Sequence, residues 1–525
     1  MTRARGRWHV AVPVLAALYS VLALAAASVR NHGQVDALPM ALGVALLAGI
    51  AAWITGGLLS RDPDRRMLVG TALVAWFAGQ HLLSLPLRRL DVSPLMVLVL
   101  SILLLGLAVS VILRSGPAVW TAARFIRNAV LILLAFPAVS FTSVLFGRHA
   151  VSAAPPVPAA VTRTNAAVAD RDVYVIVLDK YSGSSALLAS HGFDNSSFET
   201  ALRRRGFLVP PSSRSNYPHT WMSLASMLNW TFVEEILDGS PEPPVRALHR
   251  AVEDNRTWRF LRDRGYEFVF VPSTFPVTRR NAFADRVVPA AGAAARSAGM
   301  NVHHAWLAST VVLPLHELMT RFGPKEYATR QRFPYEVETA EEIEAKLDAI
   351  AGLAAERGPR YVFAHLLVPH EPYIFEADCR HREPYWPPTD YVPDQTPIRD
   401  AYVAQIRCVN SMLLTLVDRI LDASAVEPII ILQADHGHGM MAVNPMTGEQ
   451  QPLDRLDPAQ VAERMTAFAA YLLPDGGDAA LYDGITPVNV LPAIFNHYYE
   501  AAIPLRDDAI FWARLHPPFE FVRLE

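Results

Sequence analysis

Five long apolar stretches occupy the first 150 residues of this chain and limit what it can fold into. None of them contains Asp, Glu, Lys or Arg, and each is about as long as a helix needs to be to cross ~30 Å of hydrocarbon. They lie at about 9–29, 37–60, 67–87, 95–113 and 128–146. The first stretch alone has the look of a cleaved signal peptide, but the other four keep the protein in the membrane either way. We therefore expect an all-α bundle of five transmembrane helices over residues 1–147.

The arginines near the ends of these stretches predict how the bundle lies in the membrane. With a cytoplasmic N-terminus, nine arginines are inside and three are outside, which satisfies the positive-inside rule. The nine are Arg3, Arg5, Arg7, Arg61, Arg65, Arg66, Arg114, Arg124 and Arg127, and the three are Arg30, Arg88 and Arg89. Five crossings then deliver the rest of the chain to the outer side. The prediction is a multi-pass protein of the cell (inner or plasma) membrane with an extracytoplasmic domain.

Charge and cysteine content exclude several classes of protein. The net charge is −3, with no basic excess, which argues against a nucleic-acid partner. Two cysteines, Cys379 and Cys408, are too few for a disulfide-rich scaffold or a multi-cysteine zinc site. An outer location favours a disulfide between them. Two unpaired buried thiols remain the alternative, because sequence spacing does not fix their distance.

The rest of the chain predicts a linker followed by one large α/β domain. Residues 148–170 are rich in Ala, Pro and Val without an amphipathic period and are typical of a semi-rigid linker. Over 171–525, short apolar runs alternate with helical patterns, which favours a central sheet flanked by helices. The runs are nearly continuous, as in buried strands. The predicted strands are 172–178, 266–272, 360–368, 427–433 and 466–473.

Three predicted strands end in side chains that suit a metal ion. Asp179 closes the first strand, Asp435–His436–Gly437 follows the fourth, and His370 follows the third. Ligands in such sheets gather beyond the carboxyl ends of the strands. Two carboxylates and an imidazole suit Zn²⁺ or Mn²⁺. Taken singly, Asp179 is also typical of a capping residue, and His370 of a loop histidine bonded to backbone.

Thr220 supplies a candidate nucleophile. It follows the polar turn Ser215–His219 and opens a segment with helical apolar spacing. Free N–H groups and the helix dipole favour an anion at such a terminus, and a metal on the same hydroxyl would lower its pKa. The ordinary alternative is a helix N-cap.

The order and spacing of these motifs resemble the sulfatase-like branch of the alkaline phosphatase superfamily. The resemblance is greatest to its membrane-anchored phosphoryl transferases: the lipoteichoic acid synthase-like phosphoglycerol transferases and the phosphoethanolamine transferases. VYVIVLDKY is similar to the family's first strand with its acidic ligand, and HTWMSLASML to the segment with its nucleophilic threonine. VPHEPY resembles its histidine motif, and QADHGHG its late Asp–His pair. The likeness covers about residues 172–500, and these groups also place five membrane helices before an extracytoplasmic catalytic domain.

The resemblance implies a metal-dependent phosphotransferase or phosphodiester hydrolase. Its metal (Mn or Zn) would be held by Asp179, Thr220, Asp435 and His436, with Thr220 and His370 catalytic. Thr220 would take a head group from a membrane lipid or lipid-linked donor as a phospho-threonine. An envelope glycan or polymer, or water, would then accept it. The alternative is a non-catalytic binding or assembly module on the same fold.

Two departures from the family pattern bear on the substrate. The Cys/Ser-x-Pro-x-Arg signature of sulfatases is absent around Thr220, which argues against sulfate ester hydrolysis. Lys180 stands where sulfatases often carry a second Asp. It either neutralises phosphate charge or is an ordinary salt-bridged or solvent-facing lysine.

Overall fold

The protein divides into two compact units. The computed structural model describes residues 2–32, 38–80, 94–147, 171–238, 240, 242–288, 306, 309–312, 315, 338–356, 358–385, 394–439, 453–513 and 520–524. One unit comprises Met1–Val151 with Ala298–Tyr335, and the other comprises Ser152–Ser297 with Glu336–Glu525. The first unit thus includes a segment that lies within the predicted extracytoplasmic domain. From that segment, Trp306 is buried in an apolar cluster with Ala17 and Val21 of the first helix.

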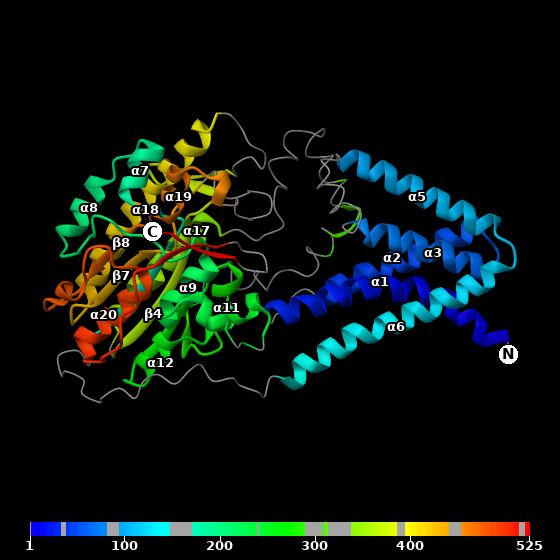
Figure 1. The fold of residues 1–525 in the computed structure, drawn as a ribbon, viewed down its shortest axis with the longest axis horizontal. Helices are drawn as coiled ribbons and strands as arrows, with labels where there is room; N and C mark the ends of the chain where they lie inside the picture. Colours follow the sequence, from blue (N-terminus) through cyan, green and yellow to red (C-terminus); the bar gives the residue numbers. More distant parts are fainter. Residues whose placement is uncertain are drawn as a thin grey trace. The chain divides into compact units, whose positions relative to one another are not determined.

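The first unit is a set of apolar helices (Figure 1). They are α1 (Thr2–His32), α2 (Leu38–Leu59), α3 (Pro63–Ala78), α5 (Pro94–Arg114) and α6 (Ala118–Gly147). Glycines allow α2 to approach its neighbours closely: a Cβ on Gly49 would lie 2.7 Å from Val14 Cα, and one on Gly56 would lie 2.5 Å from Arg66 O. Large apolar side chains point outward, with Leu58 82% and Ile132 73% exposed. Such a surface fits lipid rather than water.

Four helices, not five, are long and apolar enough to cross a membrane among the described residues. They are Trp8–Ala26, Leu38–Leu59, Leu95–Arg114 and Ala118–Pro137. The prediction of a fifth span at 67–87 is not met, because α3 has 16 residues. Its first turn holds charged side chains, Asp62 caps its start, and it ends at Gly79. Part of the predicted stretch, 81–87, lies outside the described residues.

The second unit is built on a six-stranded sheet in the order β3-β2-β4-β1-β7-β8. All neighbours are parallel except β8, which runs antiparallel to β7. The strands are β1 (Val173–Asp179), β2 (Glu267–Val271), β3 (Arg286–Val287), β4 (Arg360–Pro369), β7 (Ile429–Ala434) and β8 (Ala469–Leu472). Two small hairpin-like sheets pair β5 (Tyr373–Phe375) with β6 (His381–Tyr385) and β9 (Ile510–Ala513) with β10 (Phe521–Leu524).

Alternate residues of β1 enter two separate apolar cores, one on each face of the sheet. The core around Tyr174, Ile176 and Leu178 is completed by α7 (Ser184–His191), α8 (Ser196–Arg203), α17 (Ala340–Leu353) and α18 (Thr396–Ala423). The other core is completed by α9 (Thr220–Asn229), α10 (Val233–Leu237), α11 (Pro244–Glu253), α12 (Arg256–Arg262) and α20 (Pro487–Tyr499). The short α19 (Pro458–Met465) precedes β8 in the chain. Burial on both faces explains why β1 reads as a continuous apolar run.

A disulfide joins Cys379, between β5 and β6, to Cys408 on α18. It closes a loop with a sequence separation of 29. This resolves the alternative that the sequence left open.

We expect reduction of this bond to destabilise the second unit by about 3.5 kcal/mol, the loop-closure entropy that a cross-link of this length removes from the unfolded chain. Unfolding of the full-length protein in detergent, followed by limited proteolysis with and without reductant, measures the change. A Cys379→Ser/Cys408→Ser variant is the control and should not respond to reductant. An equal response from the variant would contradict the assignment of the effect to this bond.

Candidate active site

The candidate residues lie where the central strands of the sheet end. Asp179 is the last residue of β1, and Asp435 and His436 follow directly after β7, which pairs with β1. Pro369, at the end of β4, pairs with Asp179 on the other side, so His370 follows next to it. Parallel strands bring their carboxyl ends to the same edge of the sheet. Residues more than 250 positions apart in the sequence therefore meet there.

Asp179, Asp435 and His436 form a buried cluster. One donor atom from each lies within 4.8 Å of the other two. Asp435 Oδ2 is 3.3 Å from His436 Nε2. In a tetrahedral zinc site with bonds of ~2.05 Å, neighbouring ligand atoms are about 3.4 Å apart. The donor types and this spacing fit one divalent cation.

The electrostatics of the cluster point the same way. Burial, and then the charge of Asp435, raise the pKa of Asp179 well above its usual value. Burial likewise raises the pKa of Asp435 to about 6. Asp179 Oδ1 and Asp435 Oδ2 have no hydrogen-bond partner within the described part of the chain. Two neighbouring buried carboxylates can both ionise only when positive charge compensates them. A divalent cation would supply that charge.

Hydrogen bonds hold these side chains in the form that binds a metal. His436 Nδ1 donates to Gly437 O at 2.9 Å. Arg464 Nη2 lies 3.3 Å from His436 Nε2 and can only donate, so Nε2 carries the lone pair. Burial lowers the pKa of His436 well below its usual value, which keeps the ring neutral. Asp435 Oδ1 accepts from the backbone N–H groups of Lys180 and His436, which turns Oδ2 toward the cluster.

Thr220 lies at the same cluster. It is the first residue of α9, and His219 is the N-cap, so Thr220 is not itself a capping residue. Its Oγ1 is 3.3 Å from His436 Nε2, and its hydroxyl partly offsets the rise that burial causes in the pKa of Asp435. The side chain is buried, and the free N–H groups of the first turn of α9 lie beside it. The structure thus brings together all four residues predicted to hold the metal.

His370 and Lys180 lie at the rim of this site. His370 is about one-third exposed, and its Nδ1 donates to Glu371 O. Burial lowers its pKa to about 4, so it is neutral at pH 7 with a lone pair on Nε2. A neutral imidazole of this kind can accept a proton. Lys180 Nζ is paired with Glu371 Oε1 at 2.7 Å, so the ordinary salt-bridge alternative describes it.

Two residues of the site were not predicted from the sequence. Arg464, on α19, is buried and donates to Pro218 O, just before Thr220, and to His438 O, just after the metal-binding pair. His365 lies within β4, where its Nε2 is 3.6 Å from Asp179 Oδ2 and its Nδ1 is 2.8 Å from Thr278 Oγ1. One sequence feature could have indicated a role for His365: it interrupts the apolar run VFAHLLV. Nothing near Arg464 in the sequence distinguishes it from other arginines.

Gly437 allows the loop after β7 to pack against α19. A Cβ there would lie 2.1 Å from Glu463 O and 2.5 Å from Thr466 O. The Gly437 N–H donates to Arg464 O at 2.8 Å. This close approach leaves no room for a side chain at position 437.

We expect His365→Gln to weaken binding of Zn²⁺ by about 10- to 100-fold, the usual effect of removing a group that orients a ligand. His365 is neutral, because burial lowers its pKa to about 3, and it faces the carboxylate of Asp179. Competition titration with a zinc-binding dye measures the affinity. His497→Gln, on an exposed histidine, is the matched control. Unchanged affinity in His365→Gln would show that Asp179 needs no such support.

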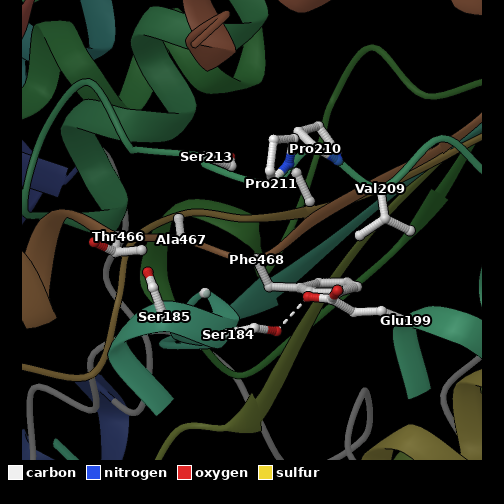
Figure 2. A pocket seen from close by; sticks show the side chains of 12 residues that line it. Ser184, Ser185, Glu199, Val209, Pro210, Pro211, Ser213, Thr466, Ala467 and Phe468 are labelled. Carbon is white, nitrogen blue, oxygen red and sulfur yellow. Dashed lines mark hydrogen bonds between the residues drawn. The ribbon is translucent and has the colours of Figure 1, made fainter. Parts of the chain in front are cut away.

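A shallow pocket opens near these elements (Figure 2). It is lined by residues of the α7 start, the segment Val209–Ser213 and the β8 approach, with Ser184 donating to Glu199. The five predicted site residues do not line it. The pocket is therefore separate from the metal cluster.

No protein-family model matches the chain, and no curated protein matches its sequence. Solved structures do match. The integral membrane protein lipooligosaccharide phosphoethanolamine transferase A from Neisseria meningitidis is 12% identical, with a TM-score of 0.41, over 92% of this chain and 95% of that one. The periplasmic domain of EcEptC from Escherichia coli, in complex with Zn, is 12% identical, with a TM-score of 0.40, over 65% and 84%.

The phosphonate monoester hydrolase of Agrobacterium radiobacter is 15% identical, with a TM-score of 0.39, over 65% of this chain and 80% of that one. A putative sulfatase from Bacteroides thetaiotaomicron is 13% identical, with a TM-score of 0.37, over 65% of this chain and 77% of that one.

Proposed function

We propose that this protein is a membrane-anchored, metal-dependent phosphotransferase or phosphodiester hydrolase that acts through a phospho-threonine on Thr220. One observation carries the proposal: a buried threonine hydroxyl at a helix N-terminus lies within 3.3 Å of one member of an Asp–Asp–His donor cluster. A nucleophile beside a metal-binding set, with helix N–H groups on the same side, is the arrangement that phosphoryl transfer needs.

The residues of the chain divide the chemical work as follows. The Asp435 carboxylate can take the proton of the Thr220 hydroxyl and return it to the leaving alcohol, whereas the Nε2 lone pair of His436 is reserved for the ion. Thr220 Oγ1 forms the bond to phosphorus as the bond to the leaving alcohol breaks. The N–H groups at the start of α9 face the phosphoryl oxygens. A Zn²⁺ or Mn²⁺ ion held by Asp179, Thr220, Asp435 and His436 would lower the pKa of the threonine and offset charge on the phosphoryl group.

Resolution of the phospho-threonine requires a second nucleophile. An acceptor hydroxyl or water attacks phosphorus, and the bond to Oγ1 breaks. Neutral His370, with its lone pair on Nε2, can take the proton of that nucleophile. A hydroxyl acceptor gives transfer and water gives hydrolysis.

We propose a lipid or lipid-linked phosphodiester as donor and an envelope glycan or polymer as acceptor. The apolar helices of the first unit hold the chain in the membrane, where a lipid donor is concentrated. We propose that the second unit is extracytoplasmic, because its Cys379–Cys408 disulfide is of a kind that persists in oxidising compartments. We also propose the predicted domain limits, 1–147, 148–170 and 171–525.

Turnover of a chromogenic phosphodiester by the full-length protein in detergent tests this function. The expected result is release of the chromophore with Mn²⁺ or Zn²⁺, loss of release after chelation, and recovery when the metal is restored. Release that persists unchanged after complete metal removal would contradict the proposal. If the protein binds metal and a phosphodiester lipid but turns over neither that lipid nor the chromogenic phosphodiester, the result would favour the non-catalytic alternative.

A further inference from the structure

A second group of metal-binding side chains lies outside the candidate active site. His191 ends α7, His438 follows β7, and Glu463 lies on α19. All three are buried, with exposed fractions of 6%, 4% and 7%. One donor atom from each lies within 4.8 Å of the other two. His438 belongs to the motif QADHGHG, but the proposed reaction uses none of the three side chains.

The spacing of the three donors matches one ion. Glu463 Oε1 is 3.0 Å from His191 Nε2 and 3.4 Å from His438 Nδ1. Ligand atoms around a tetrahedral zinc ion are separated by about 3.4 Å. The two imidazole rings are 5.3 Å apart at 77°, so they approach the carboxylate from different directions. Three donors in a triangle leave one position for water.

The partners of the two histidines favour a shared ion over a simple ion pair. Neither ring nitrogen of His191 has a hydrogen bond within the described part of the chain. Glu463 Oε1 is near Nε2 but is not placed to accept from it. A ligand oxygen lies off the axis of the ring nitrogen in this way when a metal sits between them. Without an ion, His438 Nδ1 donates a long hydrogen bond to Glu463 Oε1 at 3.4 Å, and Nε2 lies 2.9 Å from Tyr373 Oη. A bound ion would take the place of the Nδ1 proton, and Nε2 would then donate to Tyr373 Oη.

The surroundings hold these side chains in place. His438 stacks on Tyr402 with ring centroids 4.0 Å apart, and its backbone N–H donates to Ser182 Oγ. The contact of Gly437 with α19 fixes the loop that carries His438 against the helix that carries Glu463. Glu463 is a buried carboxylate, which needs a compensating positive charge. A divalent cation held between the carboxylate and the two imidazoles supplies that charge.

We propose that His191, His438 and Glu463 bind a second transition-metal ion, Zn²⁺ by its ligand chemistry, in a site with a structural role. The ion joins α7, the loop after β7 and α19. Two of those segments also carry residues of the candidate active site, His436 and Arg464. The site does not depend on the reaction proposed for Thr220.

Metal analysis of the full-length protein tests the second site separately from the first. An Asp179→Asn/Asp435→Asn variant removes two ligands of the first site. After zinc loading and exhaustive dialysis, elemental mass spectrometry should find about one zinc per chain in this variant. Adding His191→Gln should remove that ion, and adding His497→Gln, on an exposed histidine, should not. Absence of zinc from the double variant, or its retention with His191→Gln, would overturn the proposal.

A second experiment, which looks for a new signal, tests the site even if the combined variants fail to fold. His191→Cys, in the otherwise unchanged protein, replaces an imidazole ligand with a thiolate. Loading with Co²⁺ should then produce a thiolate-to-cobalt charge-transfer band in the near ultraviolet. The unchanged protein, whose two cysteines are joined to each other, should lack it. A folded, cobalt-loaded His191→Cys protein without the band would show that position 191 does not bind metal, and the three side chains would be an ion-pair cluster.

Discussion

Replacing Thr220 with alanine should reduce turnover by at least about 10³-fold, because the substitution removes the atom that bonds to phosphorus. Thr220 Oγ1 is the one hydroxyl that the structure shows against the Asp435–His436 pair, within the described residues. The loss should appear in kcat. The variant should still bind the same metal, because Asp179, Asp435 and His436 remain. Steady-state kinetics on a chromogenic phosphodiester, with elemental analysis of the same preparation, measures both.

Two variants control this prediction. Thr220→Ser keeps a hydroxyl at the same place and should retain measurable turnover. Thr415→Ala removes an exposed hydroxyl on α18 and should leave turnover unchanged. If Thr220→Ala turns over as fast as the unchanged protein, the covalent mechanism is wrong, even where the metal site stands.

Replacing Asp435 with asparagine should lower the affinity of the first site for Zn²⁺ by more than about 100-fold and abolish turnover together with it. The substitution removes a negative charge and one ligand oxygen, whereas loss of an orienting group alone costs about 10- to 100-fold. Asp435 also orders the loop through its two backbone N–H contacts, which asparagine can keep through its carbonyl oxygen. The variant should therefore lose metal binding and keep its fold.

Metal titration followed by turnover at saturating metal tests the second prediction. Asp422→Asn, on an exposed residue of α18, is the matched control and should bind metal normally. Because the charge of Asp435 raises the pKa of Asp179, removal of that charge should also let Asp179 ionise more easily. Normal metal affinity in Asp435→Asn would contradict its role as a ligand.

The sheet was predictable because each central strand carries its own signal. Continuous apolar runs at 172–178, 266–272, 360–368, 427–433 and 466–473 correspond to β1, β2, β4, β7 and β8. Their burial on both faces leaves little room for polar residues, and this produces the pattern. The hairpin-like pair β5–β6 carries polar residues such as His381 and Glu383, so it lacked that signal.

The meeting of Asp179, Asp435 and His436 was predictable, because parallel topology brings the ends of neighbouring strands together. The fifth span failed for a local reason: charged residues and the end at Gly79 limit α3 to 16 residues. Arg464 and Glu463 were not predictable, because their importance comes from the packing of α19 against Gly437. This contact joins segments that are far apart in the sequence, so no periodic pattern of residues indicates it.

The most direct measurement is the mass of the peptide that contains Thr220 after brief incubation of the full-length protein with metal and a phosphodiester donor, followed by an acid quench. The account predicts an added mass equal to the transferred phosphoryl head group, located on Thr220 and absent from Thr220→Ala. Turnover of the donor with no adduct on Thr220 at any time, and with Thr220→Ala still active, would contradict it.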